Sequence, residues 1–160
     1  LLRELLGDIY SNVPLEARLR LPDVHRSIAH TCVDMGTEDF VRGVPHPMID
    51  FRFRRERIVR EARDPETAVI LLDVVLGIGA NLDPAGELSP AIKEAKDIAA
   101  KEGRYLSVVA SITGTSGDPQ RKDVQKEKLE EVGVVVMPSN AQATRMAALI
   151  ASRGEVWEKL

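Results

Sequence analysis

Residues 67–76, with the sequence TAVILLDVVL, form an almost continuous run of apolar and mostly branched side chains. Such a run is typical of a strand that is buried on both faces of a parallel sheet. A loop with several glycines follows. A helix is predicted next, capped by Ser89 with Pro90 at its first position and ended by Gly103. A strand followed by such a helix predicts one half of a βαβ unit.

The same alternation continues on both sides of this run. Further strands are predicted at 28–35, 105–112 and 134–137, and further helices at 52–63, 120–132 and from Ser139 or Asn140 to about 152. Strands that alternate with helices of this length predict right-handed crossovers and a parallel sheet. The expected fold is therefore α/β, a three-layer flavodoxin-like sandwich with about four parallel strands. Residues 1–27 are expected to form an N-terminal helix and arm, 28–152 the domain, and 153–160 a tail.

The composition excludes several classes of protein. The chain has 160 residues, of which 44% are hydrophobic, and a net charge of −3, which disfavours a nucleic-acid binder. Its one cysteine, Cys32, excludes an internal disulfide and a multi-cysteine zinc site, and is expected to be a buried, inert thiol within a strand. No apolar run approaches the length of a membrane span. We expect a cytoplasmic protein with no metal site and no nucleic-acid or membrane partner.

Ligands of open α/β sheets bind at the carboxyl ends of the strands, and the loops that leave those ends contain small and polar residues. The candidate ligand-binding residues lie in three of these loops: Gly77, Gly79, Asn81, Thr113, Gly114, Thr115, Ser139 and Asn140. Backbone N–H groups in such loops, with the following helix N-termini, favour an anion. The alternative for each loop is purely structural: tight glycine turns, a helix cap at Ser139, or Asp118 capping the next helix.

His46 lies between two prolines in the sequence VPHPMID, so its backbone is stiff and its side chain has a fixed direction. It is the candidate catalytic residue, and the alternative is a hydrogen-bonded surface histidine in a rigid loop. The arginine-rich segment RFRRERIVREAR at 52–63 is interpreted as a solvated helix face, with contact to a neighbouring domain or to an anionic cofactor as the alternative.

Four sequence segments together resemble the FdrA family of acyl-CoA-synthetase-like proteins, which is similar to the α subunit of succinyl-CoA ligase. They are GVPHPMID, DPETAVILLDVVLGIGANLDPAGELSPAI, VVASITGTSGDPQ and GVVVMPSNAQA, and they occur in this order. The resemblance covers about Tyr10 to Ile150. It implies the flavodoxin-like fold of the ligase domain, and an upstream CoA-binding domain that this sequence lacks. The chain begins with Leu1 rather than methionine, so we expect it to be a piece of a longer protein.

The resemblance also implies what this chain lacks. The related ligase carries a phosphorylated histidine in a loop after the strand that matches 105–112, whereas all three histidines here precede residue 47. A supporting glutamate of the ligase falls at about Val74, and Asn81 stands where the family often has histidine. We therefore expect CoA or an acyl phosphate as the ligand without a phosphohistidine.

Three functions remain open from the sequence. The first is a domain of an FdrA-type acyl-CoA synthetase, the second is a subunit domain of an oxamate carbamoyltransferase, and the third is a non-catalytic assembly module. The resemblance implies the upstream CoA-binding domain, and further subunits of an oligomer, as partners.

Overall fold

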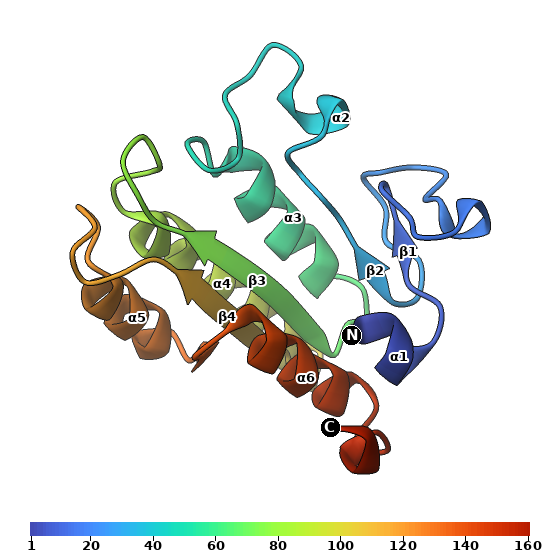
Figure 1. Cartoon of the computed structure of the whole chain (residues 1–160). Helices are drawn as coiled ribbons and strands as arrows, with labels where there is room; N and C mark the ends of the chain where they lie inside the picture. The colour runs from blue at the N-terminus through green and yellow to red at the C-terminus, as the bar shows by residue number, and fades with distance from the viewer.

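The computed structural model describes all 160 residues, and it confirms the α/β fold with a parallel sheet at its centre. The central sheet contains β3 (Val69–Val75), β4 (Ser107–Thr113) and β5 (Val135–Met137) in the order β3-β4-β5 (Figure 1). All pairs are parallel, and Ser111 on β4 lies between Asp73 on β3 and Met137 on β5. The apolar run that opened the sequence analysis is thus an edge strand of a three-stranded sheet, and within β3 only Leu72 and Val74 are buried, so the predicted burial on both faces is wrong.

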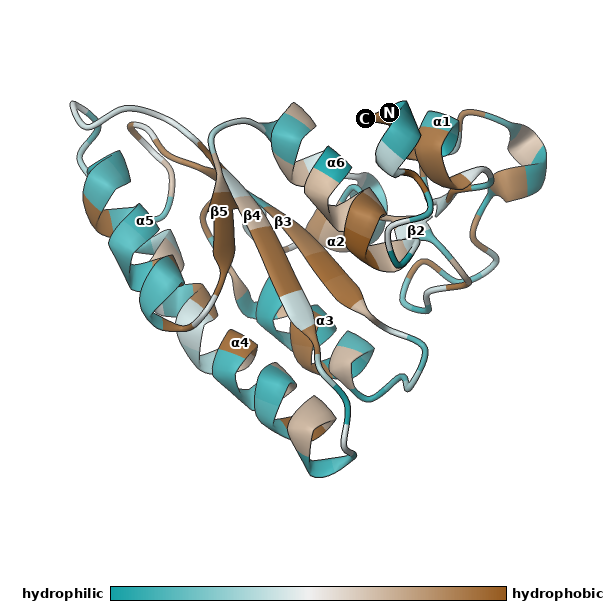
Figure 2. Cartoon of the chain, turned by 90° about the horizontal axis from the view of Figure 1, so that it is seen from below, coloured by the Kyte–Doolittle hydropathy of each residue, from teal (hydrophilic) through white to brown (hydrophobic).

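Helices cover both faces of this sheet. On one face lie α3 (Arg52–Ala62), α4 (Pro84–Lys101) and α5 (Lys122–Glu131), and on the other lies α6 (Asn140–Ala151), as Figure 2 shows. The main core lies between the sheet and the first group, where Leu72, Val74 and Ile112 pack with Leu88 and Ile92. On the other face, α1 (Leu2–Leu6) packs on α6 through Leu5 and Ala148.

The predicted first strand is the main departure from expectation. Within 28–35 only β2 (Thr31–Cys32) is a strand, and it pairs with β1 (Tyr10–Ser11) in a separate two-stranded sheet. The segment IAHTCVDM mixes polar and apolar residues and has no continuous apolar run, so it cannot fill a position buried on both faces. Consequently the main sheet has three strands rather than about four, and Cys32 is exposed rather than buried.

The start of α4 also differs from the prediction. Asp83 is the N-cap, because its carboxylate accepts a hydrogen bond from the Gly86 N–H at 3.2 Å, and Pro84 is the first helical residue. Ser89 instead lies inside the helix, where its hydroxyl donates to the Ala85 carbonyl at 2.7 Å. Asp83-Pro84 and Ser89-Pro90 both fit the cap-and-proline pattern. The burial of Pro84, Ala85 and Leu88 in the core favours the earlier start.

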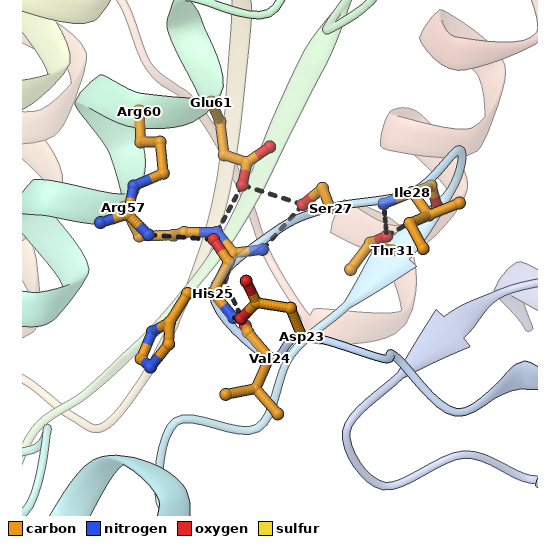
Figure 3. A network of polar contacts seen from close by, with 9 residues as sticks. All are labelled: Asp23, Val24, His25, Ser27, Ile28, Thr31, Arg57, Arg60 and Glu61. Atoms are coloured by element: carbon orange, nitrogen blue, oxygen red, sulfur yellow. Dashed lines mark hydrogen bonds and ion pairs between the residues drawn. The ribbon is translucent and has the colours of Figure 1, made fainter.

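The N-terminal arm is attached to α3 by arginines. Figure 3 shows Arg57 donating to the Val24 carbonyl at 2.8 Å and to the Ser27 hydroxyl at 2.7 Å, while Glu61 accepts from both Arg57 and Ser27. Arg60 donates to the carbonyl of His25 at 2.9 Å. Two of the arginines at 52–63 therefore hold the chain's own arm, so the segment is not a purely solvated face.

Short elements complete the chain. They are the 3-10 helices η1 (Ala17–Leu19) and η2 (Trp157–Lys159) and the single-turn α2 (Glu38–Val41). Phe40 of α2 is buried, and its ring meets the His25 ring edge-on with the centroids 5.3 Å apart. None of the helices combines the length and the apolar character that crossing a bilayer requires.

Candidate functional site at the carboxyl edge of the sheet

The three parallel strands end at Val75, Thr113 and Met137, so the loops that follow them leave the same edge of the sheet. Two of these loops come very close to each other. The Leu76 N–H donates to the Thr113 carbonyl at 2.9 Å, and a Cβ on Gly114 would lie 2.7 Å from the Leu76 Cβ. Gly114 also has a φ of 154°, so both packing and backbone conformation require glycine there.

The β3–α4 loop is held in place by the side chain of Gln120, which is 4% exposed. Its Nε2 donates to the carbonyls of Gly77 at 2.8 Å and Asn81 at 3.0 Å, and its Oε1 accepts from the Gly77 N–H at 3.1 Å. The Gly77 N–H is therefore already used inside the chain. Gly77 and Gly79, with φ of 142° and 86°, allow the backbone to turn around this amide.

The N-terminus of α4 is likewise occupied by the chain's own groups. Gln125, which is 2% exposed, accepts from the Ala85 N–H at 2.8 Å and donates to Asp83 at 3.1 Å and to the Gln120 carbonyl at 3.2 Å. Lys128 forms an ion pair with Asp83 at 2.7 Å. Burial alone would raise the pKa of Asp83, but hydrogen bonds from Lys128, Gln125 and Gly86 lower it. The helix end where an anion could bind thus already holds a carboxylate.

Neither glutamine was predicted, because a buried glutamine at the start of a helix has no pattern that distinguishes it from an exposed one. The cap at Asp83 did have a signal, the Asp-Pro pair, but Ser89-Pro90 gave the same signal six residues later.

The β4–α5 loop is more open, although Thr115 is engaged within it. The Asp118 carboxylate accepts from the Thr115 N–H at 2.6 Å and from its hydroxyl at 3.1 Å, and the Gly117 N–H donates to that hydroxyl at 3.2 Å. Asp118 therefore forms a turn with Thr115 and does not cap α5, whose N-cap is Arg121. Thr113 is exposed at the end of β4.

Ser139 caps α6, as one of the two interpretations of the sequence predicted. Its hydroxyl accepts from the Gln142 N–H at 3.3 Å, and Asn140 is the first residue of the helix. Both side chains are exposed at the carboxyl end of β5. The cap uses only one of the N–H groups of the first turn.

His46 is brought to this edge by Asn81. The Asn81 N–H donates to the Met48 carbonyl at 2.8 Å, and its side-chain Nδ2 donates to the Ile49 carbonyl at 2.9 Å. His46 itself is exposed, and its Nδ1 accepts from the Met48 N–H at 3.2 Å, which places the proton of the neutral ring on Nε2. A Cβ on Gly36 would lie 2.8 Å from that Nε2, so glycine leaves room for the ring.

Two further residues have surroundings that limit their chemistry. Val74 is completely buried in the apolar core, so its side chain offers no polar group to the loops of the edge. The pKa of Cys32 is raised by desolvation of the thiol and by the negative charges of Asp73 and Asp34. A raised pKa keeps the thiol protonated and unreactive near neutral pH. No three His, Cys, Asp or Glu side chains in the chain are grouped closely enough to hold a metal ion.

Apolar side chains also protrude at the β3 end of this edge. Ile78 is 97% exposed and Leu82 is 79% exposed, and Met48 and Ile49, which bond to Asn81, are exposed as well. Large apolar side chains that are gathered and exposed commonly mark an interaction surface.

Two comparisons connect this geometry to known proteins. A family model for CoA-ligase matches residues 12–150, which include the sheet and all three loops of the edge. The uncharacterized protein YahF of Escherichia coli strain K12 is 45% identical over 149 residues. That alignment covers 93% of this chain and 29% of YahF, so the chain spans less than a third of that relative.

Proposed function

The chain belongs to the CoA-ligase family, and on that premise we propose that it is the ligase-type domain of an FdrA-type acyl-CoA synthetase. In this proposal it binds an anionic acyl phosphate or CoA-type ligand at the carboxyl edge of the sheet and passes no phosphate through a histidine. In the same proposal, the longer protein contains an upstream CoA-binding domain, assembles with further subunits and acts in the cytoplasm.

The observation that carries the proposal is the division of donors along the edge. On the β3 side the donors are already used by Gln120, Gln125 and Asp83. On the β4–β5 side, Thr113 is exposed at the end of β4 next to Gly114, and the exposed Ser139 and Asn140 form the start of α6, which is twelve residues long. The partial positive charge of a helix N-terminus favours an anion by about 0.3–1 kcal/mol. Gly77, Gly79 and Thr115 shape the neighbouring loops, and Asn81 borders this region.

The loops where the related ligase carries its phosphorylated histidine have no histidine here. His25, His30 and His46 all precede β3, so the loops after β4 and β5 contain no histidine. His46 has its Nδ1 engaged by the Met48 N–H, which leaves it as a donor through Nε2 rather than a base. We assign it a ligand contact and no proton abstraction.

The test is incubation of the full-length protein and its partner subunits with radiolabelled ATP. We expect no acid-labile, base-stable label on any histidine, and we expect calorimetry to detect binding of CoA or acetyl phosphate. A stable phosphohistidine would refute the proposal. A protein that binds none of these ligands would refute the assignment of the edge as a ligand site.

A second candidate function, carbamoyl transfer to oxamate, is favoured by the same absence of histidine. Carbamoyl phosphate is already an acyl phosphate, so its reaction requires no phosphorylated residue. Competition between carbamoyl phosphate and acetyl phosphate in the calorimeter distinguishes the two: a preference for carbamoyl phosphate supports the transferase.

The third candidate is an assembly module without catalysis, which the exposure of Ile78 and Leu82 favours. In that case the edge contacts a partner protein, and none of the anions binds.

A further inference from the structure

The segment 42–50, which we call the strap, carries His46 between two buried anchors. Phe40 precedes it and Phe51 follows it, and both are buried, whereas no residue within the strap is buried. Figure 1 shows the chain arching between α2 and α3 along this stretch. Gly43, near its start, has a φ of 75° and open space around it. Few buried contacts and exposed backbone are typical of a segment that opens locally.

Asn81 is the only residue outside the strap and its flanks that bonds to it. Every other hydrogen bond of residues 42–50 stays between residues 38 and 52, including those from Ile49 and Asp50 to the His46 carbonyl. The two bonds from Asn81 reach the Met48 and Ile49 carbonyls. Asn81 is itself fixed, because Gln120 donates to its carbonyl and its Oδ1 accepts from the Asp83 N–H at 2.8 Å.

These contacts also determine when Asn81 can meet a ligand. Both of its donors, the backbone N–H and Nδ2, are used by the strap, so neither is available to an anion while the strap is in place. From this geometry we propose that Asn81 is a latch that holds the strap closed, and that an anionic ligand displaces the strap by taking the Asn81 donors. The ligand half of this proposal rests on the proposed function, and the latch half does not.

The experiment follows cleavage by trypsin after Arg42, which is exposed at the start of the strap and is followed by Gly43. Cleavage of a segment that opens rapidly follows the population of its open form. Cleavage after Arg121, in the β4–α5 loop, serves as the internal reference. The variant Asn81→Asp loses the Nδ2 donor and places a carboxylate oxygen against the Ile49 carbonyl oxygen. It should raise the Arg42 to Arg121 cleavage ratio about tenfold.

The matched control is Gln142→Glu, the same change from an amide to a carboxylate at an exposed residue of α6 that forms no hydrogen bond with the strap. Its ratio should equal that of the wild type. Asn81→Ala provides a second test of the latch in case the aspartate variant does not fold. If both Asn81 variants keep the wild-type ratio, the latch is refuted.

Inorganic phosphate tests the displacement. Increasing phosphate should raise the ratio in the wild type and leave it unchanged in Asn81→Asp, whose strap is already open. Phosphate that binds by calorimetry without changing the wild-type ratio refutes the displacement. Phosphate that does not bind, together with an opened strap in the variants, refutes the proposed anion site and the displacement, and supports the latch. The two failures are therefore distinguishable.

Discussion

The two halves of the carboxyl edge differ in whether their hydrogen-bonding groups are already used within the chain, although both consist of glycine-containing loops that lead into helices. On the β3 side, buried side chains of Gln120 and Gln125 satisfy the backbone groups, and Asp83 with Lys128 neutralises the helix end. On the β4–β5 side, Thr113, Ser139 and Asn140 are exposed. A glycine-rich loop before a helix therefore indicates an anion site only where the chain has left its donors free. The comparison makes the β3 half structural apart from Asn81, the proposed latch, and assigns the free donors to the other half.

The largest expected effect concerns the buried amide of the structural half. Gln125→Ala should lower the free energy of unfolding by about 2–4 kcal/mol, because it leaves the buried Ala85 N–H without its partner and removes one of the donors to Asp83. Denaturant unfolding measures this. The control Gln142→Ala, at an exposed position, should cost about 0.5 kcal/mol or less. Equal losses for the two variants would contradict the assignment of Gln125 as a structural clamp.

The next effect joins the two halves. Gly114→Ala should cost about 2 kcal/mol, because the new Cβ would lie 2.7 Å from the Leu76 Cβ at a φ of 154°. Gly117→Ala in the same loop is the control, since its Cβ would meet only the Thr115 hydroxyl at 3.5 Å. Thermal unfolding of both variants checks the difference. A Gly114→Ala protein as stable as the control would show that the loop adjusts and that the close contact is not required.

The sequence predicted the elements that have a strong local cause. The apolar runs at 105–112 and 134–137 correspond to β4 and β5, and Gly103 and Gly133 end their helices with φ of 71° and 73°. It failed where the cause is not local. Within the segment 28–35, Thr31–Cys32 pair with residues 10–11, about twenty positions earlier. A pairing of only two residues leaves no alternation of apolar and polar residues that could predict it.

The sequence predicted where the candidate site lies, but it did not predict which of its hydrogen-bond donors are free. Asn81, Thr113, Gly114 and Ser139 do lie at the carboxyl edge, as parallel strands require. Whether a donor is free depends on side chains such as Gln120, which lies 43 residues from Gly77 in the sequence. Only the folded structure brings such pairs together, so sequence patterns cannot distinguish a loop with free hydrogen-bond donors from one whose donors are already bonded within the chain.

Binding should weaken when hydrogen-bonding side chains of the open half are removed. Thr113→Ala combined with Ser139→Ala should weaken binding of acetyl phosphate to the full-length protein about fivefold to tenfold, with each lost hydrogen bond contributing about 0.5–1.5 kcal/mol. Loss of the Ser139 cap should also lower stability by about 1 kcal/mol. Calorimetry measures the affinity, and Thr115→Ala, whose hydroxyl is engaged by Asp118, is the control. Unchanged affinity together with lower stability would show that these residues only cap and turn the chain.

The smallest expected effect is the acid response of the structural half. The folded protein lowers the pKa of Asp83, so the unfolded chain holds a proton there up to higher pH than the folded one does. Its contribution to stability is therefore complete above the unfolded value of about 3.9 and is lost as pH falls through the folded pKa. Because the Asp83 side chain is 46% exposed, solvent screening limits this contribution to about 0.5 kcal/mol.

Asp83→Asn keeps an oxygen for the Gly86 N–H and removes the charge that Lys128 pairs with. The gap in unfolding free energy between wild type and variant should consequently narrow between pH 5 and pH 3, by about 0.5 kcal/mol. A gap that stays constant over that interval would mean that the carboxylate acts at the helix start only as a hydrogen-bond acceptor, and that its charge does not close this half of the edge to an anion.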